Sequence, residues 1–240
     1  MASKLGFSLL NKHCVITGGT RGIGKAIADR FLAEGAHVTV VGRSAPAVQA
    51  QDHDRSKIMY HRGDVTDETT WKNISRQMRD PDVLVNCAGV TQRKLLVGLE
   101  SEDARGIIDT NLYSAILGCR YAAKSMMRNK RGGCIINVSS LLARKGVEGT
   151  SIYAATKAGL LGLTSSLAVE YGRFNVRVNA LVPGYIDTAM TDNLDPGRLA
   201  NIPLGRFGAV DEVADAAAFL AKNPYASNCI LNIDGGLSAA

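Results

Sequence analysis

The sequence predicts one α/β domain in which helices cover both faces of a doubly wound parallel sheet. Strand-like runs rich in Val and Ile alternate with helical patterns along the chain, and a glycine-rich turn joins the first strand to the first helix. Parallel strands need long crossover connections, which place helices on the two faces of the sheet. No repeat or linker divides the chain, so we expect residues 1–240 to form a single domain.

The elements follow in order from short apolar runs and from helical periodicity. A buried strand at 13–17 leads through the glycine turn into a helix at 25–33. Longer helical patterns cover 101–128, 152–172 and 209–222. The seven predicted strands are 13–17, 37–41, 58–62, 83–86, 133–138, 176–181 and 229–233.

The glycine-rich turn predicts a dinucleotide site. Residues 17–24 read Thr-Gly-Gly-Thr-Arg-Gly-Ile-Gly and pass directly into a helix. Glycines let a bulky phosphate approach backbone N–H groups at the positive end of that helix. A strand before the turn and a second strand after the helix give the context of such a site. The candidate cofactor contacts in the turn are Gly18, Thr20, Arg21, Gly22, Ile23 and Gly24.

A tyrosine and a lysine four residues apart stand at the start of the helix at 152–172. At that spacing Tyr153 and Lys157 lie on one helical face. A nearby positive charge favours phenolate, so we expect Lys157 to lower the pKa of Tyr153 from its usual value of about 10. The pair is then a candidate proton donor near neutral pH.

Together these motifs resemble those of the short-chain dehydrogenases/reductases, and the resemblance covers nearly the whole chain. It implies a Rossmann-like seven-stranded sheet in the order 3-2-1-4-5-6-7, with ligands at the carboxyl edge. Cys87 departs from the pattern, because the family usually has Asn there. The matching residues are Thr-Gly-x-x-x-Gly-x-Gly at 17–24, Asn-Cys-Ala-Gly at 86–89, Asn111, Ser140, Tyr-x-x-x-Lys at 153–157, Pro183-Gly184, Thr188 and Ile-Asp-Gly-Gly at 233–236.

The resemblance also implies a role for each catalytic candidate. Tyr153 would donate a proton to a substrate carbonyl, Lys157 would hold the nicotinamide ribose, and Ser140 would hydrogen-bond the carbonyl oxygen. Ser139 is a rival for Ser140, but adjacent side chains at a strand end point to opposite sides. Asn111 would mark a kinked helix whose main chain holds a water linked to Lys157; the alternative is a surface position.

Further cofactor contacts are carried over from the family at the ends of several predicted strands. Asp64 and Val65 would contact the adenine, although Asp64 could equally cap a turn or a helix. The other implied contacts, besides Tyr153 and Lys157, are Asn86, Ala88, Gly89, Pro183, Gly184, Ile186 and Thr188.

The charge after the second strand favours NADPH/NADP+ over NADH/NAD+. An NAD site usually has an acidic residue about 20 residues beyond the glycine turn, where it binds the ribose 2′-OH. This chain has Gly42-Arg43-Ser44. Arg43, together with Arg21, could instead clamp a 2′-phosphate through guanidinium hydrogen bonds. The alternative is that both arginines point into solvent.

Within the family the chain is most similar to the 3-oxoacyl-[acyl-carrier-protein] reductases and related carbonyl reductases, chiefly through residues 201–208. This implies reduction of a 3-oxoacyl thioester on acyl carrier protein in fatty acid synthesis. The short segment 185–207, expected to cover the substrate, suits an extended chain. The alternatives are a carbonyl or quinone reductase of broader specificity and a non-catalytic NADP(H)-binding sensor or scaffold. The complete set of catalytic candidates speaks against the sensor.

The net charge of +6 and the apolar surplus indicate partners. An acidic carrier protein could be steered by a basic set formed by Arg128, Lys130, Arg131 and Arg173. Nucleic acid is not expected, because no such motif accompanies the charge. The helices at 101–128 and 152–172 carry more apolar residues than one sheet-facing stripe needs, and the resemblance implies a homotetramer in which residues 235–240 help a second interface.

Composition favours a soluble intracellular protein, in the cytoplasm or the mitochondrial matrix. Neither an apolar run of about 18 residues nor a secretory signal is evident, so we expect no membrane span. The five cysteines lack the spacing of metal ligands, so we expect reduced thiols and no metal site.

Overall fold

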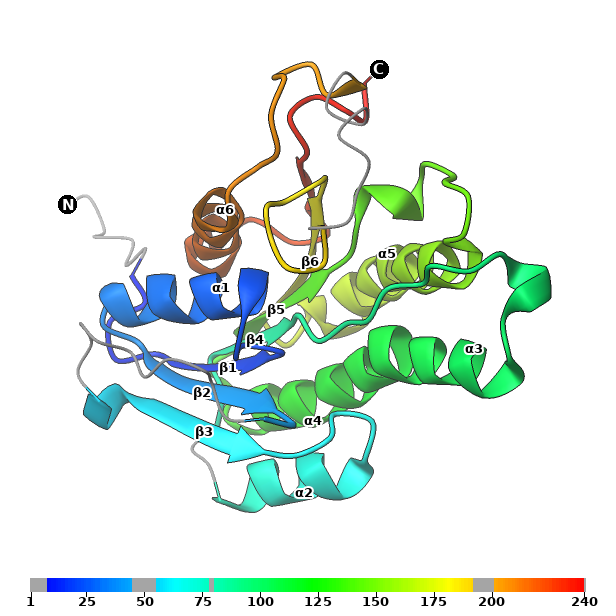
Figure 1. The fold of residues 1–240 in the computed structure, drawn as a ribbon. Coiled ribbons are helices and arrows are strands. Elements are labelled where there is room, and N and C mark those ends of the chain that lie inside the picture. The colour runs from blue at the N-terminus through cyan, green and yellow to red at the C-terminus, as the bar shows by residue number, and fades with distance from the viewer. Residues whose placement is uncertain (1–7, 45–54, 78–79, 192–200, 240) are drawn as a thin grey trace.

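A computed structural model describes residues 8–44, 55–77, 80–191 and 201–239 (Figure 1). Seven parallel strands form one sheet in the order β3-β2-β1-β4-β5-β6-β7, which confirms the predicted fold class and strand order. The predicted strands agree with the observed ones to within two residues at each end. The strands are β1 (His13–Thr17), β2 (His37–Gly42), β3 (Ile58–Arg62), β4 (Val83–Asn86), β5 (Gly133–Val138), β6 (Val176–Pro183) and β7 (Ile230–Ile233).

Helices cover the sheet on both sides. One face carries α1 (Gly22–Ala33) and α6 (Val210–Lys222), which lie together above the sheet in Figure 1. The other face carries α2 (Glu68–Gln77), α4 (Ser114–Arg128) and α5 (Ser151–Gly172). The three predicted helix starts at 25, 152 and 209 differ from the observed ones by three residues or fewer.

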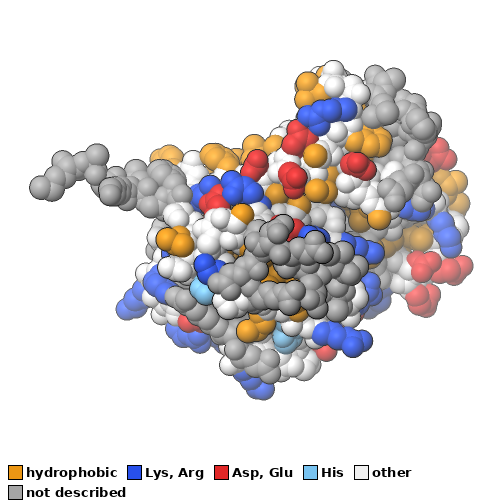
Figure 2. Space-filling model, turned by 60° about the vertical axis from the view of Figure 1, so that its left-hand side comes forward, with side chains coloured by type: hydrophobic (Ala, Val, Ile, Leu, Met, Phe, Trp, Pro, Cys, Tyr) orange, Lys and Arg blue, Asp and Glu red, His pale blue; other side chains and the backbone are white. Residues whose placement is uncertain are grey.

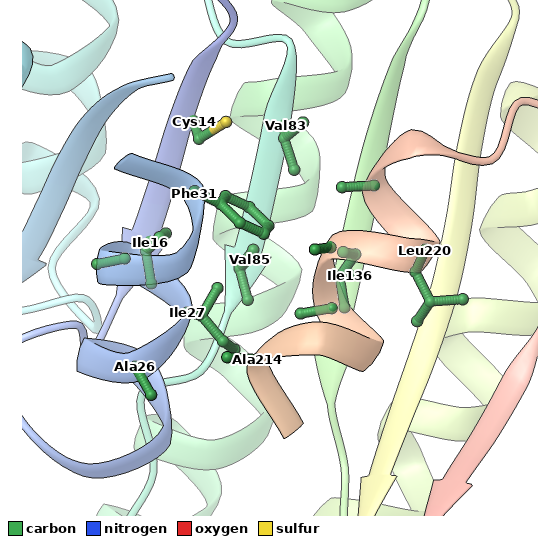
Figure 3. Close-up of a cluster of buried hydrophobic side chains, with 14 of the residues drawn as sticks. Cys14, Ile16, Ala26, Ile27, Phe31, Val83, Val85, Ile136, Ala214 and Leu220 are labelled. Atoms are coloured by element: carbon green, nitrogen blue, oxygen red, sulfur yellow. The ribbon is translucent and has the colours of Figure 1, made fainter. Parts of the chain in front are cut away.

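Two hydrophobic cores separate the layers because successive side chains of a strand point to opposite faces. In β1, Ile16 joins the core beneath α1 and α6, whereas its neighbour Val15 joins the core beneath α2, α4 and α5. Figure 3 shows Ile27 and Phe31 of α1 directed at the strands of the first core. Burial on both faces explains why the strands are nearly continuous apolar runs.

The predicted helix 101–128 is interrupted at the place where a kink was expected. It consists of α3 (Ser101–Ile108), a π-helical turn at Asp109–Tyr113, and α4. Asn111 lies in that turn and is 1% exposed, so the alternative of a surface position is wrong. Single π-helical turns within α-helices occur frequently at functional sites.

All five cysteines lie in the described ranges and are free thiols. Cys14, Cys119 and Cys134 are buried, and burial raises the pKa of each, for Cys119 to about 12. Cys87 is half-buried, and its pKa is also raised by burial, to about 11. The thiolate is the reactive form of cysteine, so these side chains are chemically quiet at neutral pH.

One helix has the length and composition of a membrane span. Among the described residues, α5 is the one helix long and apolar enough to cross a membrane by length and composition. It also packs along β6 and carries the buried Lys157, and core helices of water-soluble proteins pass the same test. The described part of the chain contains no group of three or more His, Cys, Asp or Glu placed to hold a metal ion.

Arg177 joins β6 to the last turn of α6. Its guanidinium donates hydrogen bonds to the carbonyls of Leu220 and Ala226 at 2.8 Å and of Ala221 at 2.7 Å. The final carbonyls of a helix lack intrahelical partners, and a cation there also interacts favourably with the helix dipole. This side chain therefore anchors α6 to the sheet.

We predict that Arg177→Met lowers the free energy of unfolding by about 2–4 kcal/mol, because three carbonyls lose a charged partner. Urea denaturation at a fixed protein concentration measures the loss. The matched control is Arg128→Met, which breaks an ion pair with Asp80 whose arginine side chain is 68% exposed. Exposed pairs contribute about 1 kcal/mol or less, so equal losses for the two variants would contradict the assignment.

Candidate active site

The loops that leave β1 and β4 are fastened together at the carboxyl edge of the sheet. The buried Thr17 hydroxyl, at the end of β1, accepts hydrogen bonds from the N–H groups of Cys87 and Ala88 at 3.0 and 3.1 Å. A Cβ added at Gly18 would lie 2.8 Å from Ala88 Cα, so a larger residue would push the loops apart. Sequence analysis missed this role of Thr17; its position directly before the glycine turn is the signal that points to it.

The glycine turn also meets the ends of β2 and β6. Gly22 adopts φ 53°, a region that favours glycine, and a Cβ there would lie 3.7 Å from the Thr188 methyl group. The Thr20 methyl group would lie 3.2 Å from a Cβ at Gly42. The predicted contacts Gly18, Thr20, Gly22, Ala88 and Thr188 therefore surround one end of α1. This cradle, which larger residues would fill, fits a dinucleotide phosphate.

Ser140, Tyr153 and Lys157 come together between the end of β5 and the start of α5. All three side chains are buried. Lys157 Nζ donates to the carbonyl of Val138 at 2.8 Å and lies 5.7 Å from the centroid of the Tyr153 ring. It also approaches the β4 loop, because a Cβ at Gly89 would lie 3.5 Å from Nζ. The structure thus unites the three predicted side chains at the expected edge.

Burial controls the acidity of this group. It raises the pKa of Tyr153, a hydrogen bond with Ser140 partly offsets the rise, and the neighbouring Cys87 thiol adds to it. Burial lowers the pKa of Lys157 to about 8. The predicted lowering of the Tyr153 pKa by Lys157 is not found in this structure, because burial of the phenol raises that pKa. Tyr153 is held as a neutral phenol, which suits a proton donor.

The two neighbouring serines face different ways, as predicted. The Ser139 hydroxyl donates to the carbonyl of Lys157 at 2.7 Å and helps to fix α5. Ser140 is hydrogen-bonded to Tyr153, and its hydroxyl accepts from the N–H of Leu142 at 3.2 Å. Ser140 is therefore the serine that can share a carbonyl oxygen with Tyr153.

Asn111 ties the π-helical turn to the β4 loop. Its Oδ1 accepts from the Val90 N–H at 2.8 Å, and its Nδ2 donates to the Val90 carbonyl at 2.9 Å and to the Thr156 hydroxyl at 3.2 Å. These bonds use both amide hydrogens of the side chain and one acceptor position of Oδ1. The side chain therefore fixes the π-helical turn against the β4 loop.

The two arginines predicted to bind a 2′-phosphate both lie at the carboxyl edge of the sheet. Arg21 is the residue before α1, and Arg43 follows β2; both are exposed. Arg62 was not predicted, but it ends β3 beside Gly42 and adds a third cation at this edge. Hydrogen bonds from Thr66 lower the pKa of Asp64, and the positive charge of Arg43 lowers it further.

The two predicted adenine contacts are engaged in local structure. Asp64 accepts from the N–H and hydroxyl of Thr66 at 2.9 and 2.8 Å, so the alternative of a turn-capping residue is present. Val65 is buried, and its carbonyl accepts from Trp71 Nε1 at 2.9 Å. Hydrogen bonds from these residues to an adenine would therefore use the backbone N–H of Val65 and the second carboxylate oxygen of Asp64, Oδ2.

The side chain of Asn86, one of the implied cofactor contacts, points away from the cradle. It is buried against α4, where its Nδ2 donates to Asn137 Oδ1 at 2.9 Å and to Cys119 Sγ at 3.4 Å. Thr17, its register partner in β1, lies on the same face of the sheet, but its hydroxyl accepts from the N–H groups of the β4 loop. Asn86 can contribute to cofactor binding only through its main chain.

The segment expected to cover the substrate begins after β6. Pro183 ends the strand, and Gly184 lies so close to Asp234 that a Cβ would come within 2.8 Å of its Cα. Ile186 is buried and pairs with Gly208. The predicted covering residues Asp192, Leu194, Asp195 and Leu199 lie outside the described residues.

A hollow of about 450 Å³ opens beside this cover, lined in part by Tyr185, Pro203, Leu204 and residues 232–236. We place the chemistry at Tyr153 instead, because that is where the proton-donating group and the cofactor cradle meet.

The proposed steering residues lie at the opposite edge of the sheet. Arg128 is the last residue of α4, and Lys130 and Arg131 lie between α4 and β5. Arg173 directly follows α5 and precedes β6. Helices of such crossovers run against the strands, so they end at the amino edge. These residues therefore do not flank the crevice of their own subunit. Figure 2 shows Lys and Arg spread over the visible face among acidic side chains.

Comparisons with known proteins identify the family of the chain. A family profile described as enoyl-(acyl carrier protein) reductase matches residues 18–238. The chain is 39% identical to carbonyl reductase family member 4 of Xenopus laevis and 38% identical to a 3-oxoacyl-[acyl-carrier-protein] reductase of Rattus norvegicus, covering in each case 95% of this chain and 98% of the relative.

The fold recurs in solved structures of such proteins. A gluconate 5-dehydrogenase from Burkholderia cenocepacia in complex with NADP and tartrate superposes with a TM-score of 0.90 at 28% identity, covering 98% of both chains. A short chain dehydrogenase/reductase family protein gives the same score at 34% identity, over 97% of this chain and 100% of that one. Sequence, fold and site agree, and the chain belongs to the short-chain dehydrogenase/reductase family.

Proposed function

We propose that this chain reduces a 3-oxoacyl thioester to the 3-hydroxyacyl thioester, with the acyl chain on acyl carrier protein, as a step of fatty acid synthesis. The chain is an oxidoreductase of its family, and NADP(H) is its cofactor. The observation that carries the proposal is the buried group of Ser140, Tyr153 and Lys157 beside the cradle at α1. The names of relatives at 38% identity support the substrate class.

Each residue of the group has one task. NADPH, when bound, supplies the hydride. Tyr153 donates its phenolic proton to the substrate carbonyl oxygen, and Ser140 hydrogen-bonds the same oxygen. Lys157, largely charged below its pKa of about 8, stabilises the phenolate left behind and holds the ribose hydroxyls. The alcohol leaves, and Tyr153 regains a proton from water by way of Lys157 and the main chain of Asn111.

A carrier protein would have to be recognised across a subunit interface. Four large side chains near this face are exposed: Ile108 at the end of α3, Tyr113 in the π-helical turn, Ile116 on α4 and Val169 on α5. If α4 and α5 paired with their copies about a two-fold axis perpendicular to the helices, this face would be covered. Each helix would then run antiparallel to its copy in the second subunit. The amino-edge arginines of one subunit would then flank the crevice of its partner. The homotetramer is part of this proposal.

Broader carbonyl reduction is the second candidate, favoured by the name carbonyl reductase family member 4 of a relative. It uses the same chemistry without a carrier. A non-catalytic sensor would need no buried phenol hydrogen-bonded to a serine, so it is less well supported. The compartment, cytoplasm or mitochondrial matrix, stays a prediction.

We predict that Tyr153→Phe lowers kcat by about 10²–10⁴, because only the proton-donating oxygen is removed. NADPH affinity, measured by fluorescence titration, should change little. Tyr225→Phe is the matched control, since that tyrosine is 97% exposed and lies between α6 and β7, on the amino side of that strand. Near-normal turnover by a folded Tyr153→Phe protein would overturn the mechanism.

Cofactor choice tests the role of the arginines. NADPH should bind at least tenfold more tightly than NADH, about 1.4 kcal/mol, because a guanidinium can pair with the 2′-phosphate. Arg43→Asp should abolish or reverse this preference in direct binding measurements. Arg173→Asp makes the same charge change at the opposite edge and should leave the preference intact. Equal affinities in the unaltered protein would contradict the assignment.

The carrier is tested by comparing kcat/KM for a 3-oxoacyl carrier protein with that for a short thioester mimic. We predict a higher value for the carrier-bound substrate, with an advantage that fades as ionic strength rises, as steering does. Arg131→Glu with Arg173→Glu should remove the advantage without slowing the mimic. The control is Lys72→Glu with Arg76→Glu on α2, which makes the same change in net charge. Ketones or quinones reduced far better than every 3-oxoacyl thioester, with no benefit from carrier, would favour the second candidate.

A further inference from the structure

Gln92 links the β4 loop to the first turn of α5. Its side chain is 3% exposed. Oε1 accepts hydrogen bonds from the N–H groups of Ile152 at 2.7 Å and Tyr153 at 3.2 Å. Nε2 donates to the Lys94 carbonyl at 2.8 Å and to the Ser151 hydroxyl at 3.3 Å. Because the partners of Oε1 can only donate and the Lys94 carbonyl can only accept, the orientation of the amide is fixed.

These bonds supply a helix cap from a distant part of the chain. The first N–H groups of a helix have no partner within it and are usually capped by the residue just before the helix. That residue, Thr150, directs its hydroxyl to the Val147 carbonyl at 2.6 Å. Gln92, 60 residues before Ile152, takes its place. The cap therefore satisfies the N–H groups at the start of α5 and also joins that helix to the β4 loop.

The carbonyl of Tyr153 is held by way of the same loop. It accepts from the Thr156 hydroxyl at 2.7 Å, and that hydroxyl accepts from Asn111 Nδ2 at 3.2 Å. Asn111 in turn is hydrogen-bonded to both the N–H and the carbonyl of Val90. Both polar groups of the Tyr153 backbone are thus connected to residues 90–92. A shift of this loop would move the phenol relative to Ser140.

We infer that Gln92 is a positioning residue that sets the placement of the Tyr153 phenol for proton transfer, an inference that rests on the proposed role of Tyr153. Proton donation requires hydrogen-bond distance, and small displacements from such geometry reduce rates strongly. An amide also caps the helix without adding charge. A carboxylate at the same place would disfavour phenolate and raise the pKa of Tyr153.

The experiment compares Gln92→Leu, Gln92→Glu and Tyr153→Phe with the unaltered enzyme, using NADPH and any ketone that the enzyme reduces. Gln92→Leu keeps the size but loses all four bonds. Its kcat should fall at least tenfold, while the Kd for NADPH stays within twofold. Asp67→Ala is the matched control: it removes the cap that Asp67 gives the N–H of Thr69 in α2, and should lower Tm while leaving kcat within twofold.

Gln92→Glu keeps the acceptor and adds a charge. Its kcat should lie within about fivefold of that of the unaltered enzyme. The rate of alcohol oxidation rises with pH, and the apparent pKa of this rise should increase by at least half a unit. A folded Gln92→Leu enzyme with kcat within twofold of the unaltered enzyme overturns the inference. If Gln92→Leu does not fold, a pH profile of Gln92→Glu that superposes on the original overturns it. Turnover retained by Tyr153→Phe would instead count against the proposed function.

Discussion

The site depends on one constraint, which is the close approach of loops at the carboxyl edge of a parallel sheet. Backbone groups there have left the strand ladder, and those that are buried need other hydrogen-bond partners. Side chains from neighbouring segments provide these partners. Thr17 and Asn111 accept hydrogen bonds from N–H groups of the β4 loop, and Gln92 accepts from the first N–H groups of α5. Each of these bonds fixes two segments that are far apart in sequence. The same bonds that satisfy the backbone therefore also locate Tyr153.

This arrangement lets the protein keep an ammonium and a phenol out of water. Burial works in opposite senses on the two groups, lowering the pKa of Lys157 to about 8 and raising that of Tyr153. Both shifts favour the neutral forms. A ligand with negative charge and hydroxyl groups would favour the charged lysine, so occupancy of the cradle and the acidity of the reacting groups are coupled. Electrostatics of this kind is a property of the assembled edge and of no single residue.

Sequence reasoning reached the strands, the glycine turn and the reactive group because each is encoded locally. The apolar runs at 13–17 and 133–138 are buried on both faces, and Tyr153 and Lys157 share one helix. It failed where three-dimensional placement decides. The position of Arg128 at the amino edge, away from the crevice, depends on helix direction. Gln92 carries no local sign of its role, because the two N–H groups that it caps lie 60 and 61 residues away.

The five free thiols give the fold a further property. Cys14, Cys119 and Cys134 are packed between layers, and burial holds their pKa values above the usual range. An alkylating reagent reacts with the thiolate, so it must wait until a segment opens to water. The rate of alkylation at each position then reports how often that layer separates. The chain thus carries three built-in reporters of local opening: Cys14 on β1 and Cys134 on β5 lie in the core beneath α1 and α6, and Cys119 on α4 lies in the core on the other face.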